Sequence, residues 1–170
     1  MNRSPREGEP SRPTAFLSYY HGDADAAISF IRSFGEVFQR VLSVGVSNRD
    51  TKGWADDENL LLDRIRLKYL ADSSVTIVLI GETTWSRRFI DWEIAATLGG
   101  SHPRALMGVL LPTVGTAPRL PERLASSKGQ PIVWPYPQAP AELRKWIEEV
   151  AAVGSGPTKG RLLRRDHLTK

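Results

Sequence analysis

A continuous apolar run over residues 75–80, Val-Thr-Ile-Val-Leu-Ile, constrains the fold of this 170-residue chain more than any other segment. A strand with one solvated face alternates apolar and polar residues, whereas a strand covered on both faces is apolar nearly throughout. Helical patterns precede and follow the run, so helical crossovers connect it to its neighbouring strands. We therefore predict a parallel strand here, with helices on both faces of its sheet.

The rest of the chain continues the alternation of strand and helix patterns, and the fold class follows from it. We predict an α/β, flavodoxin-like, doubly wound parallel sheet of four to five strands with helices on both faces. Amphipathic helices are predicted over residues 24–42, 58–70, 87–98 and 140–153. Further strands are predicted over residues 14–20 and 105–111, with room for short ones near 44–47 and 131–134. The apolar line of the first helix is Ala27, Ile31, Phe34, Phe38 and Leu42.

The excess positive charge of the chain lies at its ends. The net charge is +4, but residues 157–170 hold five basic side chains against one acidic, and residues 13–156 hold 15 basic and 16 acidic. Nucleic-acid-binding domains carry a basic patch on the folded part, so this distribution argues against nucleic acid. We predict a flexible segment over residues 1–12, one domain over 13–156 and a basic, disordered tail over 157–170. The tail's alternative role is weak contact with nucleic acid, acidic lipid or an acidic partner.

Several classes of site are excluded by missing residues. The chain has no cysteine, which excludes disulfides, cysteine zinc sites and thiolate nucleophiles, and His21, His102 and His167 are too far apart in sequence to suggest a metal site. No P-loop, GxGxxG or GxSxG pattern occurs. No apolar run reaches the length of a membrane span, and no signal segment is visible, so we expect a cytoplasmic protein without a bound metal.

The helix over residues 87–98 carries the most informative carboxylate, Glu93. Helical spacing places Ile90, Ile94 and Leu98 on the core line and Glu93 on its shoulder, one to two turns from the helix start. This end of the helix points toward the edge of the sheet where ligands bind in such folds. A partly buried carboxylate there can have a shifted pKa and hydrogen-bond ligand hydroxyls, whereas the alternative is a surface ion pair with Arg87 or Arg88.

Aromatic side chains are concentrated at the same predicted edge. Flat rings can stack on nicotinamide or adenine, but they can equally cap the core. The two arginines at the helix start, Arg87 and Arg88, can bind phosphates or lie on a solvated face. The aromatic residues are Tyr19, Tyr20, Trp54, Trp85, Phe89 and Trp92.

Three segments in order resemble motifs of TIR domains. Residues 14–21, Thr-Ala-Phe-Leu-Ser-Tyr-Tyr-His, resemble the first strand of that family, and residues 72–81 resemble its Ser-x-x-apolar strand. Residues 85–94, Trp-Ser-Arg-Arg-Phe-Ile-Asp-Trp-Glu-Ile, resemble the helix that contains the family's glutamate. The prokaryotic TIR-like branch of Thoeris antiphage defence is the closer match, and the resemblance covers about residues 14–114.

The resemblance implies cleavage of the nicotinamide–ribose bond of NAD⁺, with Glu93 in the position of the catalytic glutamate. Phe89 stands where the family usually has Trp and Ile90 where it has Cys. Residues 50–54 match the mobile loop that closes the pocket. The residues expected to contact substrate are Phe16, Ser18, Tyr19, Tyr20, Trp54, Trp85, Ser86 and Phe89.

The resemblance also implies partners and leaves alternatives open. NAD⁺ is expected as substrate, with no separate cofactor, and the product is a cyclic ADP-ribose-type signal that activates a partner effector. Self-association is expected to complete the site. The alternatives are a non-catalytic TIR-like assembly module and a nucleoside deoxyribosyltransferase-like enzyme, which also attacks an N-glycosidic bond.

Overall fold

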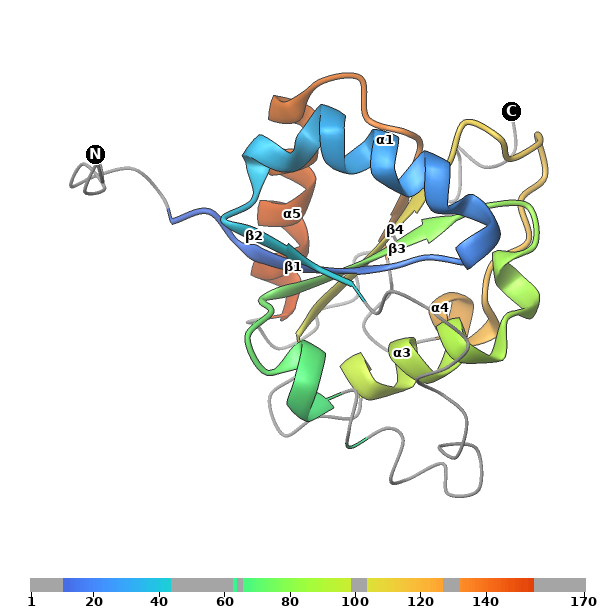
Figure 1. The fold of residues 1–170 in the computed structure, drawn as a ribbon, viewed down its shortest axis with the longest axis horizontal. Helices are drawn as coiled ribbons and strands as arrows, with labels where there is room; N and C mark the ends of the chain where they lie inside the picture. Colours follow the sequence, from blue (N-terminus) through green and yellow to red (C-terminus); the bar gives the residue numbers. More distant parts are fainter. Residues whose placement is uncertain (1–10, 44–62, 64–65, 99–103, 127–131, 155–170) are drawn as a thin grey trace.

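Five parallel strands form a single sheet in the order β2-β1-β3-β4-β5 (Figure 1). The computed structural model describes residues 11–43, 63, 66–98, 104–126 and 132–154. This topology confirms the predicted α/β, flavodoxin-like sheet, and the apolar run lies in its central strand, β3. The strands are Thr14–Ser18 (β1), Arg40–Leu42 (β2), Val75–Ile80 (β3), Ala105–Leu110 (β4) and Ile132–Trp134 (β5).

Helices cover both faces of the sheet (Figure 1). Ala24–Phe34 (α1) and Pro140–Gly154 (α5) pack on one face. On the other face lie Arg88–Leu98 (α3), the short helix Glu122–Ser126 (α4) and a wide helical turn over Arg66–Leu70. Short 3₁₀ turns occupy His21–Asp23, Gly35–Val37 and Thr84–Ser86.

The alternation of side chains along β1 decides which residues can meet α3. Ala15 and Leu17 pack in the core beneath α1 and α5, whereas Phe16 packs on the opposite face with residues of α3. Ser18, two residues after Phe16, faces the same way and is completely buried. The last residue of β1 therefore presents its hydroxyl to the α3 layer.

The helix predicted over residues 24–42 is wrong in its second half. It ends at Phe34, and after a 3₁₀ turn the chain becomes extended at Phe38. The amide of Gln39 donates to the carbonyl of Pro13, and β2 pairs with β1 in register. Pairing with β1 satisfies backbone groups that a continued helix would leave without partners at the edge of that strand. These hydrogen bonds between strands outweigh the local helical spacing of apolar residues.

The predicted core lines of two helices also need correction. In α1 the buried residues are Ala27, Phe30 and Phe34, while Ile31 is 36% exposed. In α3 the predicted Leu98 is 40% exposed, because it lies in the last helical turn, outside the packed core clusters. Spacing alone does not fix which side of a helix meets the sheet, since a rotation of one residue gives an almost equally apolar line.

Other predicted elements are found with small differences or lie outside the described residues. The fifth strand and the last helix are present, and the short helix α4 was not predicted. The possible strand near 44–47 and most of the helix over 58–70 are not among the described residues. Within the part of the chain that the structure describes, no helix is long and apolar enough to cross a bilayer.

Gly108 permits close packing of β4 against its neighbours. A Cβ atom at this position would lie 2.8 Å from Cδ1 of Ile80 and 3.1 Å from Cγ2 of Val133. Gly108→Ala is therefore expected to lower the free energy of unfolding by about 1–3 kcal/mol, measured by urea denaturation. Gly115→Ala is the matched control, because a Cβ there would have no neighbour within 4 Å. Equal stability of the two variants would contradict this account of the packing.

Candidate active site

The carboxyl end of β1 lies at the point where the strand order reverses. β1 pairs with β2 on one side and with β3 on the other, and Ser18 is in register with Val78 of β3. In doubly wound sheets ligands bind outside the strands at such a switch point, where the two crossovers leave in opposite directions. The side chains at the ends of β1 and β3 and at the start of α3 therefore form the candidate site.

Glu93 of α3 is the buried carboxylate of this site. Its side chain is 2% exposed, and one carboxylate oxygen, Oε2, accepts a short hydrogen bond from the hydroxyl of Ser18. The surface ion pair with Arg87 or Arg88 that the sequence left open is not formed, because Glu93 points inward to β1. The two residues are 75 positions apart in the chain, so only the packing of α3 on β1 joins them.

Burial controls the protonation of Glu93. Removal from water raises its pKa from 4.5 to about 8, and the hydrogen bond from Ser18 opposes this rise by stabilising the carboxylate. No basic side chain among the described residues forms an ion pair with Glu93. A carboxyl group in this state is neutral in much of the population at pH 7, and it becomes charged readily when a cation binds beside it.

Two buried threonines fix the helix that carries Glu93. Thr97 lies one turn after Glu93, and its hydroxyl donates to the Glu93 carbonyl at 2.9 Å. The Thr97 hydroxyl also lies 3.0 Å from that of Thr76 in β3. These contacts fix the position of α3 relative to β3. Neither residue was predicted from the sequence, although Thr76 is the only polar residue in the apolar run and was a usable signal.

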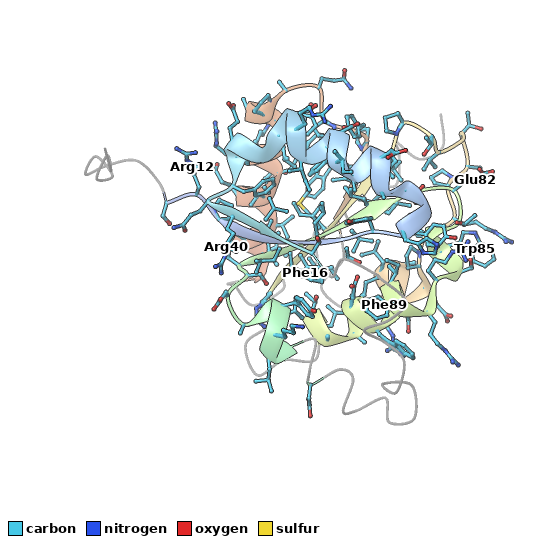
Figure 2. The ribbon with its side chains drawn as sticks, viewed as in Figure 1. Arg12, Phe16, Arg40, Glu82, Trp85 and Phe89 are labelled. Carbon is cyan, nitrogen blue, oxygen red and sulfur yellow. The ribbon has the colours of Figure 1, made fainter. Side chains whose placement is uncertain are left out.

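The predicted aromatic residues lie in three places: beneath α3, against the core under α1 and α5, and near the surface. Phe16 is buried beneath α3, where Phe89 and Trp92 of the helix pack in the same cluster (Figure 2). Tyr19 packs instead against the core under α1 and α5, so the structure does not bring it together with Glu93. This follows from strand alternation, since Tyr19 is one residue out of phase with Ser18. Phe16 and Phe89 form the apolar side of the candidate site.

The remaining predicted contacts lie nearer the surface. Trp85 lies at the surface and is 42% exposed (Figure 2). The guanidinium carbon of Arg119 lies 4.4 Å from the centre of its ring. The hydroxyl of Ser86 donates to the carbonyl of Thr83 and so closes the turn before α3.

Trp54 and the loop over residues 50–54 lie outside the described residues. Tyr20 follows the end of β1 and stacks on Arg87, with 3.8 Å between guanidinium carbon and ring centre.

A second polar cluster joins the connections after β1 and β3. The carboxylate of Asp23 lies directly against Gly81, where any Cβ atom would collide with it. Burial raises the pKa of Asp23, while the charge of Arg87 and a hydrogen bond from Thr84 oppose the rise. Sequence patterns gave no signal for this cluster, because it joins residues of two irregular connections about 60 positions apart.

The chain matches the family described as "Thoeris protein ThsB, TIR-like domain" over residues 16–116. The matched segment begins in β1 and ends after β4, and it includes both Ser18 and Glu93. No curated protein matches the chain.

Proposed function

The chain belongs to the family of TIR-like domains of the Thoeris protein ThsB, and from this premise we propose that it cleaves the nicotinamide–ribose bond of NAD⁺. The observation that carries the proposal is the buried carboxylate of Glu93, held by Ser18 at the switch point of the sheet. The match covers the segment that contains both residues. Membership of the family supports a role in antiphage defence, and the carboxylate supports a chemical one.

The chemistry requires one carboxylate and no acid to protonate the leaving group. When the C1′–N bond breaks, its electron pair moves to the positively charged pyridinium nitrogen, and nicotinamide leaves as a neutral molecule. The ribose carbon becomes an oxocarbenium-like cation, as in glycoside cleavage. Ionised Glu93 would stabilise this cation and hold the ribose hydroxyls, in a site where burial strengthens the interaction.

The second half of the reaction decides the product. Attack by water, with loss of a proton, gives ADP-ribose, whereas attack by an atom of the adenosine half gives a cyclic ADP-ribose-type product. Phe16 and Phe89 pack in one apolar cluster under the helix that carries Glu93, and apolar surroundings favour cyclisation by excluding water. We propose that the cyclic product is the signal for a partner effector, and that self-association completes the site.

Turnover by the purified chain tests the proposal. The protein is incubated with NAD⁺ over a wide range of protein concentrations, including molecular crowding agents, and nicotinamide and nucleotide products are followed by mass spectrometry. Release of nicotinamide supports the proposal, and a product of ADP-ribose mass less water identifies cyclisation. No turnover under any of these conditions would leave a non-catalytic assembly module as the function. Transfer of deoxyribose between bases would instead identify a deoxyribosyltransferase-like enzyme.

The pH dependence of the rate follows from the protonation of Glu93. Because burial raises its pKa to about 8 and the ionised form stabilises the cation, kcat/KM is expected to rise with pH through this value. Bound substrate carries a positive nicotinamide ring, which favours the carboxylate, so the rise in kcat is expected at lower pH.

Ser18→Ala provides the test of this assignment. The variant removes the hydrogen bond that stabilises the carboxylate, so its kcat/KM profile is expected to rise at higher pH than that of the unmodified protein. Rates are measured from pH 6 to pH 10 in buffers of constant ionic strength. A profile that is flat over this range, or unchanged in the variant, would contradict the assignment.

A further inference from the structure

Arg87 is held in place at the edge of the candidate site, and it forms no ion pair with the residues that the structure describes. It precedes α3, its guanidinium stacks on the ring of Tyr20 at 3.8 Å, and Nη2 donates to Oγ1 of Thr83 at 3.0 Å. Within the described residues no carboxylate lies within 4 Å of it, and its buried Nε has no hydrogen-bond partner. The guanidinium is thus oriented by two contacts, while most of its five N–H donors have no hydrogen-bond acceptor in the described part of the chain.

The neighbouring acid only partly compensates this charge. Asp23 is close enough for its charge to interact with Arg87, but it is placed against Gly81 and Thr84, and its Oδ2 has no hydrogen-bond partner among the described residues. Two other arginines of the fold are used differently. Arg40 pairs with Asp72 at 3.0 Å, and Arg104 donates to main-chain carbonyls. The guanidinium groups of these two residues bind acceptors of other segments, whereas Arg87 meets the segment after β1 through the face of the Tyr20 ring.

The position of Arg87 relative to Glu93 suggests what it binds. Arg87 precedes Glu93 by six residues, a rise of about 9 Å along the helix, which is comparable to the length of a nucleoside unit. Tyr20, on which it stacks, follows Ser18 by two residues at the end of β1. A ribose held by Glu93 and Ser18 would therefore have its 5′ substituent near the stacked pair.

We propose that Arg87, backed by the ring of Tyr20, binds the pyrophosphate of the dinucleotide substrate. This inference rests on the proposed function. A planar guanidinium with free parallel N–H groups matches two phosphate oxygens, and stacking on an aromatic ring reduces the entropy lost when it binds. The pyrophosphate does not change charge when the nicotinamide bond breaks, so Arg87 binds the ground state and the transition state alike.

Arg87→Gln is expected to raise KM for NAD⁺ by about 10- to 100-fold with little change in kcat, because uniform binding is lost. The same variant should weaken binding of ADP-ribose to a similar degree in titration calorimetry, and make that binding less dependent on salt. Binding of adenosine, which has no phosphate, should not change. Arg32→Gln on the exposed part of α1 is the matched control and should leave all of these values unchanged.

Calorimetry with ADP-ribose separates this inference from the proposed function. Binding that depends on Arg87 without any turnover of NAD⁺ would support the phosphate site and overturn the proposed enzyme. Turnover with the same KM and ADP-ribose affinity in Arg87→Gln and Arg32→Gln would overturn the phosphate site alone. Absence of ADP-ribose binding by the unmodified protein would also overturn it. If Arg87→Gln does not fold, Arg87→Lys decides, since it keeps the charge but loses the planar fork and should raise KM by about 3- to 10-fold.

Discussion

Glu93→Gln is expected to lower the rate of NAD⁺ cleavage by at least about 10²- to 10³-fold, the usual effect of removing one electrostatic stabiliser of a transition state. Glutamine has nearly the same shape, and its amide oxygen can still accept the hydrogen bond from Ser18. What the variant lacks is the negative charge opposite the developing ribosyl cation. KM should change less than kcat, because positive charge reaches the ribose carbon beside Glu93 only in the transition state.

The matched control for this experiment is Glu82→Gln. Glu82 lies in the connection between β3 and α3, at the same edge of the molecule as Trp85, but its side chain is exposed (Figure 2). Both variants lose one negative charge at this edge, so any long-range effect of net charge on substrate binding is common to them. Nicotinamide release is measured for both proteins at saturating NAD⁺. Equal rates in the two variants would remove Glu93 from the chemistry.

Glu93→Gln is also expected to make the protein more stable than the unmodified protein at alkaline pH. The pKa of Glu93 is 4.5 in an ordinary environment and about 8 in the folded protein. Between these values the folded state binds more protons than the unfolded state, so the free energy of unfolding falls as pH rises. The favourable contribution is complete below pH 4.5 and is lost as pH passes about 8. At about 1.4 kcal/mol for each pKa unit, the expected loss is several kcal/mol.

Urea denaturation at several pH values measures this effect. The difference in stability between Glu93→Gln and the unmodified protein should increase from pH 5 to about pH 8, in favour of the variant, and then level off. Burial also raises the pKa of Asp23, which destabilises the fold in the same direction, but Asp23 is present in both proteins and its contribution cancels. A difference that does not vary with pH would show that water reaches Glu93 in the folded protein.

The loss of activity and the change in stability that are expected for Glu93→Gln have one physical cause, the burial of Glu93. The burial that makes an ionised Glu93 costly to the folded protein also makes the carboxylate effective against a positive charge, since there is little water to screen it. Ser18 offsets part of the cost with its hydrogen bond, and a cationic substrate would offset more. The site is therefore expected to be least stable when it is ionised and empty.

Much of the fold could be predicted from local sequence patterns. The apolar run in Val75–Ile80 required a strand covered on both faces, and the structure places it at the centre of the sheet. Alternating patterns then predicted the parallel topology. Prediction failed where two local tendencies were similar in strength, as at residues 35–42, where pairing of β2 with β1 replaced the second half of a helix.

The candidate site was predicted less completely. Helical spacing identified Glu93 and placed it beside the core line, but spacing alone favoured a surface ion pair over burial. Strand alternation could have shown that Tyr19 and Ser18 face opposite sides of the sheet, and it would have removed Tyr19 from the list. Thr97, and the cluster of Asp23 with Arg87, had no sequence signal of their own.

The sequence by itself determined the sheet, its layers and the helix that carries Glu93, because apolar periodicity is a local property of consecutive residues. Only the tertiary structure decided that Glu93 is removed from water, that Ser18 is its hydrogen-bond donor, and that Arg87 is held against Tyr20. The physical reason is that desolvation and partner choice depend on which distant segments pack together. The charge state of a carboxylate and the direction of a guanidinium are consequences of that packing.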